Sequence, residues 1–125
     1  MNGNENLVKI IDYLKEAAAS VRELEAEAKD ALLNKDDVDI YRSKLEQKAM
    51  LIIDLESEIE DSMTGLDPTL SRRIKAGLSR FALSAERGLG LGSLFYLSAL
   101  LYPEDHVEGE MNDLENFIGA LKRSL

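Results

Sequence analysis

The 125-residue chain contains no cysteine and no tryptophan, only two prolines and a single histidine. Without cysteine it cannot form a disulfide, a thiolate metal site or a cysteine nucleophile. Long apolar runs are also missing, because the longest nearly apolar stretch, residues 89–102, has 14 residues where a membrane-spanning helix needs about 20. We therefore expect a buried hydrophobic core in a single domain, residues 1–125.

Acidic residues outnumber basic ones by 24 to 15, and the net charge of −9 is unevenly distributed. Residues 1–63 carry −8 and residues 102–125 carry −4, whereas residues 64–101 carry +3. Because an acidic chain repels nucleic acid and anionic lipid, we expect neither as a partner. The first residues lack the basic flank and apolar block of a secretory signal, so we expect a cytoplasmic protein.

Apolar residues recur at alternating spacings of three and four at the start of the chain, which predicts a helix over residues 4–33. The positions are Leu7, Ile10, Leu14, Ala17, Val21, Leu24, Ala28 and Ala31. Asn and Asp in the segment 34–37 favour the end of this helix and the start of a second one over residues 37–63. A strict heptad would place Lys48 and Ser62 in the apolar seam of the second helix, and we therefore expect that helix to curve across a globular core.

Glycine, proline and capping residues mark the remaining boundaries. The segment 64–68 can end the second helix and cap a third over residues 68–87. A fourth helix over residues 92–102 is apolar nearly all round, which predicts that it lies at the centre of the bundle. A capping box beginning at Asn112 predicts the last helix, 112–124. The predicted fold is an all-α bundle of four to five helices built on a long N-terminal antiparallel hairpin.

Three glycines at alternate positions interrupt the apolar run that follows the third helix: Gly88, Gly90 and Gly92. They do not form a phosphate-binding loop, because a dinucleotide motif needs a preceding strand and a P-loop needs a following Lys. In a continuous helix, Gly88 and Gly92 would allow another backbone to approach closely. In a broken helix they would form a kink or a short loop, and the sequence leaves both open.

Five basic residues in the third helix are candidate contacts for an anionic partner: Arg72, Arg73, Lys75, Arg80 and Arg87. Three of the arginines are seven residues apart and therefore share one side of the helix. The alternative is intramolecular pairing with acids of the second helix, such as Glu56, Glu60 and Asp61. No aromatic residues interleave with the arginines, which argues against binding of single-stranded nucleic acid by stacking.

Catalytic residues are not apparent, because the serines lack a nucleophile elbow and His106 is the only histidine. His106 lies in an acidic loop, 104–110, but the paired ExxH motifs of di-iron bundles are missing, so we predict no metal and no cofactor. Tyr96 and Tyr102 should bury their rings and place their hydroxyls beside this loop. Together with His106 they predict a polar rim around a small pocket.

A resemblance to flagellar export chaperones of the FlgN and FliT type rests on two segments, ALLNKDD at 31–37 and YRSKLEQKAMLI at 41–52. The resemblance covers about residues 7–60. It implies a small cytoplasmic bacterial protein that holds a helix of its partner in an apolar groove.

These observations predict a non-enzymatic helical interaction, adaptor or chaperone-like module that binds another protein or itself. A homodimer is included because helices about 45 Å long offer more apolar edge than a short third helix covers. The alternative is a small-molecule or metal-binding bundle with its site near Tyr96, Tyr102 and His106. A third hypothesis is an anion or nucleic-acid binder that uses the five basic residues.

Overall fold

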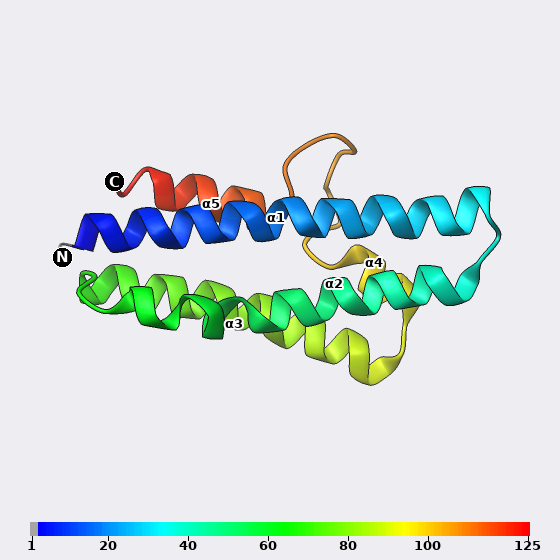
Figure 1. Ribbon diagram of the computed structural model, residues 1–125, viewed down its shortest axis with the longest axis horizontal. Helices are drawn as coiled ribbons and strands as arrows, with labels where there is room; N and C mark the ends of the chain where they lie inside the picture. Colours follow the sequence, from blue (N-terminus) through cyan, green and yellow to red (C-terminus); the bar gives the residue numbers. More distant parts are fainter. Residues whose placement is uncertain (1–2) are drawn as a thin grey trace.

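The computed structural model describes residues 3–125 and contains helices joined by short turns and one longer loop (Figure 1). The elements are α1 (Gly3–Asn34), α2 (Val38–Ile59), the 3-10 helix η1 (Glu60–Met63), α3 (Pro68–Leu91), α4 (Leu94–Ala99) and α5 (Asp113–Lys122). Within the described residues there is no strand, and the prediction of an all-α bundle built on an N-terminal hairpin is confirmed.

The hairpin forms because one apolar stripe on α1 packs along its length against a matching stripe on α2 (Figure 1). Every position of the predicted α1 stripe is buried except Leu24, which is half-buried. The Asp37 carboxylate accepts a hydrogen bond from the Ile40 amide at 3.0 Å and so caps α2. Asp36 adopts a left-handed φ of 51°, which lets the chain reverse between the two helices.

The second helix is shorter than predicted, because its α-helical part ends at Ile59 instead of residue 63. Residues 60–63 tighten into η1, a common end for an α-helix. Gly65, with φ of +84°, then turns the chain so that the buried Leu66 packs against the core. This turn is held to α1 by the side-chain amide of Asn6, which donates to the Thr64 carbonyl.

The third helix is longer than predicted and runs through Gly88 and Gly90 to Leu91. A Cβ at Gly88 would lie only 2.8 Å from Leu97 Cδ2 and 3.0 Å from Tyr96 Cδ1, so this glycine permits close packing of α4 on α3. Gly92 has a left-handed φ of 62° and ends the helix. The sequence left open a continuous helix or a break at the glycines, and the structure contains both. The helix is continuous through Gly88 and Gly90 to Leu91, and the chain turns at Gly92.

We expect opposite effects from the same substitution at two of these glycines. Gly88→Ala should lower the free energy of unfolding by about 1 kcal/mol, since overpacking against the buried Leu97 outweighs the gain in helix propensity. Gly90 faces open space, so Gly90→Ala should raise the free energy of unfolding by about 0.5–1 kcal/mol, because alanine is favoured over glycine inside a helix. Urea unfolding of both variants measures this difference, and changes of the same sign would contradict it.

The fourth helix is shorter than the predicted 92–102 and does not lie at the centre of the bundle. It packs on α2 and α3 in the half of the molecule nearer the hairpin turn, which extends beyond it (Figure 1), and its Phe95 side chain is 83% exposed. The helix ends at Ala99 because Leu100 is extended and Leu101 adopts a left-handed φ of 75°. Both leucines are buried, so the chain leaves the helix in order to place them in the core.

The last helix begins as predicted, with both hydrogen bonds of the capping box formed between Asn112 and Glu115. It ends at Lys122, two residues before the predicted boundary, and packs on α1. Residues 100–112, which we call the connector, arch past α1 from α4 to α5 (Figure 1). Among residues 3–125, no helix is both long enough and apolar enough to cross a lipid bilayer.

Candidate functional site

A fully buried lysine on α2, Lys48, is the centre of the candidate site. Its ammonium lies 2.9 Å from Glu25 Oε2 on α1 and donates hydrogen bonds to the backbone carbonyls of Leu97 and Ser98, each at 3.2 Å. These two carbonyls belong to the last turn of α4, where the helix leaves carbonyls free to accept further hydrogen bonds; the Leu97 carbonyl also accepts from the Leu100 amide at 3.3 Å. Lys48 therefore lies in the apolar seam, at the position where a strict heptad places it, and Glu25 offsets its charge there.

Burial and charge act in opposite directions on this lysine. Burial lowers the pKa of Lys48 because the charged form loses its hydration, and the negative charge and hydrogen bond of Glu25 partly offset this effect. A buried charge without such a partner is strongly unfavourable. The stability of the junction between α1, α2 and α4 therefore depends on both Lys48 and Glu25.

Tyr102 connects this pair to the connector. Its hydroxyl donates to Glu25 Oε1 at 2.6 Å and accepts from Arg22 Nη1 at 3.0 Å. The Lys48 ammonium lies 5.3 Å from the centre of the Tyr102 ring, within the range of a cation–π contact. Burial, with a further contribution from the hydrogen bond to Glu25, raises the pKa of Tyr102 to about 12. The phenol is therefore protonated at neutral pH and acts as a donor.

Arg22 fixes the connector to both α1 and α5. Its guanidinium donates two hydrogen bonds to Glu115, at 2.7 and 3.2 Å, and a third to the Glu110 carbonyl at 3.1 Å. The hydrogen bond from Arg22 is the main reason why the pKa of Glu115 lies below its usual value. Glu115 also accepts from the Asn112 amide at 2.8 Å, so the arginine and the cap of α5 share one carboxylate. The ends of the connector are held by these bonds.

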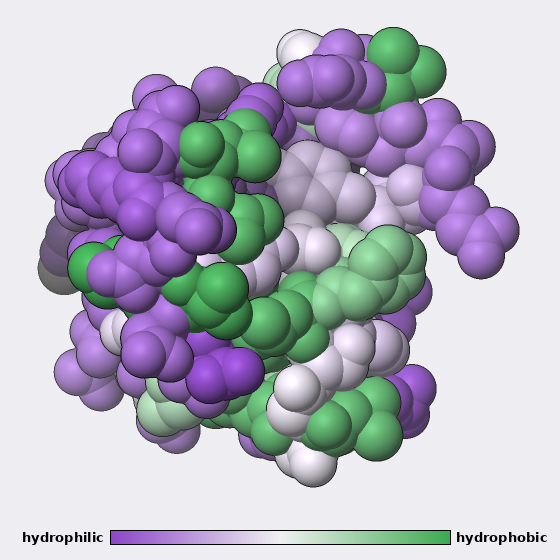
Figure 2. All heavy atoms as spheres, turned by 90° about the vertical axis from the view of Figure 1, so that its right-hand side faces the viewer, coloured by the Kyte–Doolittle hydropathy of each residue, from purple (hydrophilic) through white to green (hydrophobic). Residues whose placement is uncertain are grey.

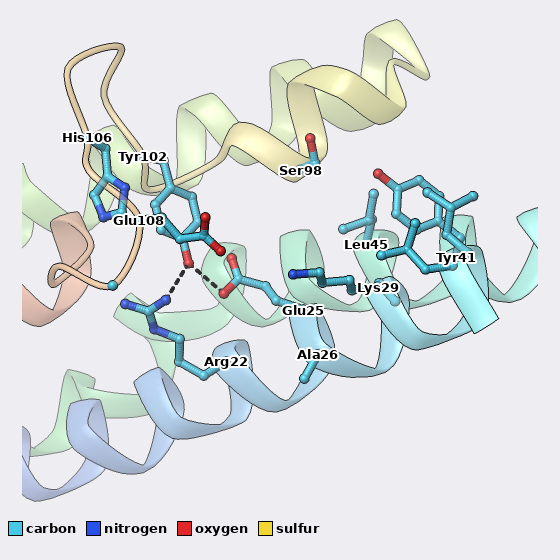
Figure 3. A pocket seen from close by; sticks show the side chains of 14 residues that line it. Arg22, Glu25, Ala26, Lys29, Tyr41, Leu45, Ser98, Tyr102, His106 and Glu108 are labelled. Atoms are coloured by element: carbon cyan, nitrogen blue, oxygen red, sulfur yellow. Dashed lines mark hydrogen bonds between the residues drawn. The ribbon is translucent and has the colours of Figure 1, made fainter.

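A cleft of about 600 Å³ opens beside this network, between α1, the start of α2, the end of α4 and the connector (Figure 3). We call it the connector cleft. Its polar end contains Arg22, Glu25, Tyr102 and His106, and the Tyr102 and His106 rings meet edge to face at 4.8 Å. Its apolar end is formed by side chains of α1 and α2: Ala28, Leu32, Leu33, Tyr41 and Leu45.

The apolar end of the cleft continues onto the outer surface at the hairpin turn. Figure 2 views the molecule from this end and shows apolar side chains gathered around a hollow. The exposed large apolar residues of the segments that meet here are Leu33, Val38, Ile40, Leu91 and Phe95. We call these five residues the apolar end face.

The structure brings together two of the three predicted pocket residues. Tyr102 and His106 both line the connector cleft, whereas Tyr96 lines a second cavity, which it shares with Tyr102 and Phe95, and packs against α3 at Gly88. Tyr102 belongs to the hydrogen-bonded network around Lys48, and His106 meets its edge, where Nε2 lies 3.1 Å from the Glu110 carbonyl that Arg22 also binds. No three His, Asp or Glu side chains among residues 3–125 are grouped closely enough to hold a metal ion.

The basic residues of α3 do not form the predicted intramolecular salt bridges. Across the described part of the chain, none of Arg72, Arg73, Lys75, Arg80 and Arg87 takes part in an ion pair. Glu56 instead accepts a hydrogen bond from the Ser79 hydroxyl at 2.8 Å. The pairing with acids of α2 is therefore wrong, and these side chains project toward solvent.

Lys48, Glu25 and Arg22 were missed by reasoning from the sequence. One feature could have found the first of them, because a lysine that falls in an otherwise apolar heptad seam needs a buried acidic partner. Arg22 and Glu25 flank the α1 stripe and differ in no visible way from other charged residues of that helix.

The charged groups of the site mainly bind one another, so the geometry holds the connector in place beside an open cleft. Such an arrangement can present a preformed surface to a ligand. Comparisons with models of protein families, with curated proteins and with solved structures found no match for this chain.

Proposed function

We propose that this protein is a non-enzymatic binding module that holds an apolar segment of a partner protein in the connector cleft. The observation that carries the proposal is the continuity between the apolar end of the cleft and the apolar end face. Large contiguous apolar surfaces of a folded chain are typical of interaction sites, whereas single exposed apolar residues are ordinary.

Exposure of the side chains supports the proposal. Leu33 is 67% exposed and lines the apolar end of the cleft, and Leu91, at the end of α3, is 65% exposed. Covering such side chains releases free energy of about 25 cal/mol for each Å² removed from water. A partner that inserts one apolar side chain into the cleft and covers the end face would use both surfaces at once.

The buried network supports the proposal in a second way, because it fixes the connector before any partner arrives. Arg22 and Tyr102 join the connector to α1, and Lys48 joins α4 to the hairpin. A preformed cleft loses less conformational entropy on binding than a loop that must first be ordered.

A helix is the form of partner segment that we infer. An amphipathic helix can place apolar side chains three and four residues apart into a groove between helices. This inference agrees with the resemblance to flagellar export chaperones and with a cytoplasmic location, both of which stay predictions. A second copy of the chain is the alternative occupant.

The proposal is tested with the double variant Leu33→Asp/Phe95→Asp and the control Leu83→Asp, whose residue is 60% exposed but lies on the side of α3 near Glu56. A partner captured from the source cells by wild-type protein should bind the double variant at least about tenfold more weakly, since two apolar contacts are lost. The control should bind normally.

One outcome would exclude this proposal, and another would change which molecule occupies the connector cleft. Equal binding by wild type and the double variant would exclude the end face as the site. A wild-type dimer in light scattering that the double variant converts to a monomer would identify a second copy as the occupant.

A small amphipathic ligand is the second candidate, and the polar end of the cleft favours it. The volume of about 600 Å³ lies within the range of small-molecule sites, and Arg22, Lys29 and His106 line one side. Native mass spectrometry of the purified chain distinguishes the two candidates. A copurified molecule of a few hundred daltons above the chain mass of 13.9 kDa supports the small ligand.

A further inference from the structure

A second groove lies between α3 and α5, on elements that the connector cleft does not use. It encloses about 450 Å³ and is lined by Arg73, Ala76, Arg80, Phe117, Ala120 and Leu121. We call it the α3–α5 groove. It exists because α5 packs on α1 and reaches α3 chiefly through Phe117, whose ring lies on Gly77 and meets the Phe81 ring edge to face at 5.8 Å.

Two arginines line this groove, and within residues 3–125 neither has a carboxylate at ion-pair distance. Neither Arg73 nor Arg80 forms an ion pair within residues 3–125, although the net charge of the chain is −9. One acid, Asp113, lines the adjoining cavity with Arg80 and Phe117 but forms no ion pair with either arginine of the groove. Free cations beside an apolar floor match a ligand that is both acidic and apolar.

The spacing of the arginines selects the shape of that ligand. Arg73 and Arg80 are seven residues apart on one helix, which corresponds to about 10 Å along the helix axis. A single phosphate or carboxylate would contact both only if the two side chains converged on it. Two acidic side chains seven residues apart on a second helix have the same spacing and could lie opposite the two arginines.

The charge of the whole molecule argues against nucleic acid as the ligand. Binding to a phosphate backbone draws its affinity from many cations along an extended track, and here two arginines line the groove of an acidic chain. An acidic helix needs only local complementarity. Its apolar side chain would contact Phe117, Ala76 and Ala120 between the two arginines.

We propose that the α3–α5 groove binds an acidic amphipathic helix of a partner protein, with Arg73 and Arg80 each contacting a carboxylate. This site is separate from the connector cleft. A module with both would join two partners, which is the role of an adaptor.

The test measures binding of a designed peptide by fluorescence anisotropy at low and high salt. The peptide is an alanine-based helix of about five turns, with leucines along one face and two glutamates seven residues apart beside them. In a matched peptide both glutamates are replaced by glutamine. We expect the glutamate peptide to bind wild-type protein more tightly than the glutamine peptide and to lose that advantage at high salt.

Two double variants of the protein locate the binding. Arg73→Gln/Arg80→Gln should weaken binding of the glutamate peptide about fivefold, as expected for two exposed charge pairs. Arg72→Gln/Lys75→Gln removes the same charge from the same helix but outside the groove, and should leave binding within about twofold of wild type. Leu33→Asp/Phe95→Asp should not change it, which separates this proposal from the connector cleft.

Three results would overturn the proposal. The first is no detectable binding of the glutamate peptide to wild-type protein. The second is that Arg73→Gln/Arg80→Gln and Arg72→Gln/Lys75→Gln weaken binding of the peptide equally. This result would show that net charge alone attracts the peptide. The third is tighter binding of a DNA duplex or inorganic phosphate than of the peptide, with the same dependence on Arg73 and Arg80.

Discussion

Glu25→Gln is expected to lower the free energy of unfolding by about 3–5 kcal/mol, the usual loss when a buried ion pair keeps its charge but loses its partner. The Lys48 ammonium is fully buried, and among residues 3–125 its only counterion within the ion-pair distance is Glu25, at 2.9 Å. The two backbone carbonyls that remain accept hydrogen bonds but carry no full charge. Urea unfolding followed by circular dichroism measures the loss.

The double variant Glu25→Gln/Lys48→Met is the control for this prediction. Methionine fills the space of the lysine stem without a charge, so the glutamine no longer faces an isolated ammonium. Replacing a buried ion pair by residues of similar volume is often neutral or stabilising. We therefore expect the double variant to be more stable than Glu25→Gln alone. If instead the two losses simply add, the pair does not act as a unit.

The same pair predicts how stability depends on pH. The folded pKa of Lys48 lies below its unfolded value of 10.5, so the unfolded chain binds more protons between the two values. The contribution of Lys48 to stability therefore increases as pH rises through that window. In Glu25→Gln the carboxylate no longer raises the pKa of Lys48 against the effect of burial, so the folded pKa should fall further. The increase in the free energy of unfolding with pH should therefore begin at lower pH and be larger.

Much of the fold follows from residue spacing alone. The α1 stripe at alternating intervals of three and four leaves little choice but a buried helix face, and Asn112 with Glu115 marks the start of α5 because two side chains satisfy free amides there. The ends of α3 and α4 could not be predicted in this way. They depend on the close contact of Gly88 with Leu97 and on the burial of Leu100 and Leu101, which arise only after packing.

The candidate site was predictable only in part, for a related reason. His106 stood out as the only histidine, and Tyr102 as an aromatic residue that lies next to the acidic loop in the sequence. Arg22 and Glu25 lie 77 to 93 residues away from the partners they bind in the connector and α5. Contacts at such separations are set by how the connector passes α1, and no local pattern in the sequence records them.

Tyr102→Phe is expected to lower the free energy of unfolding at neutral pH by about 1–3 kcal/mol, the range for leaving buried hydrogen-bonding groups without a partner. The variant keeps the ring and removes the hydroxyl that donates to Glu25 and accepts from Arg22. Tyr41→Phe is the matched control, because Tyr41 lines the same cleft but its hydroxyl forms no hydrogen bond within the described residues. It should change stability by less than about 0.5 kcal/mol.

The alkaline limb of the stability curve separates the role of this hydroxyl from that of the ring. The folded pKa of Tyr102 is about 12 against 10.0 for a free tyrosine, so between these values the folded chain keeps a proton that the unfolded chain has lost. The stability that this group contributes is complete below pH 10 and is lost as pH rises through 12. Tyr102→Phe should therefore lose less stability than wild type over this range, measured by urea unfolding at several pH values. A parallel decline in both proteins would show that the Tyr102 hydroxyl does not hold the connector through Glu25, and the cleft would then have to be ordered by Arg22 alone.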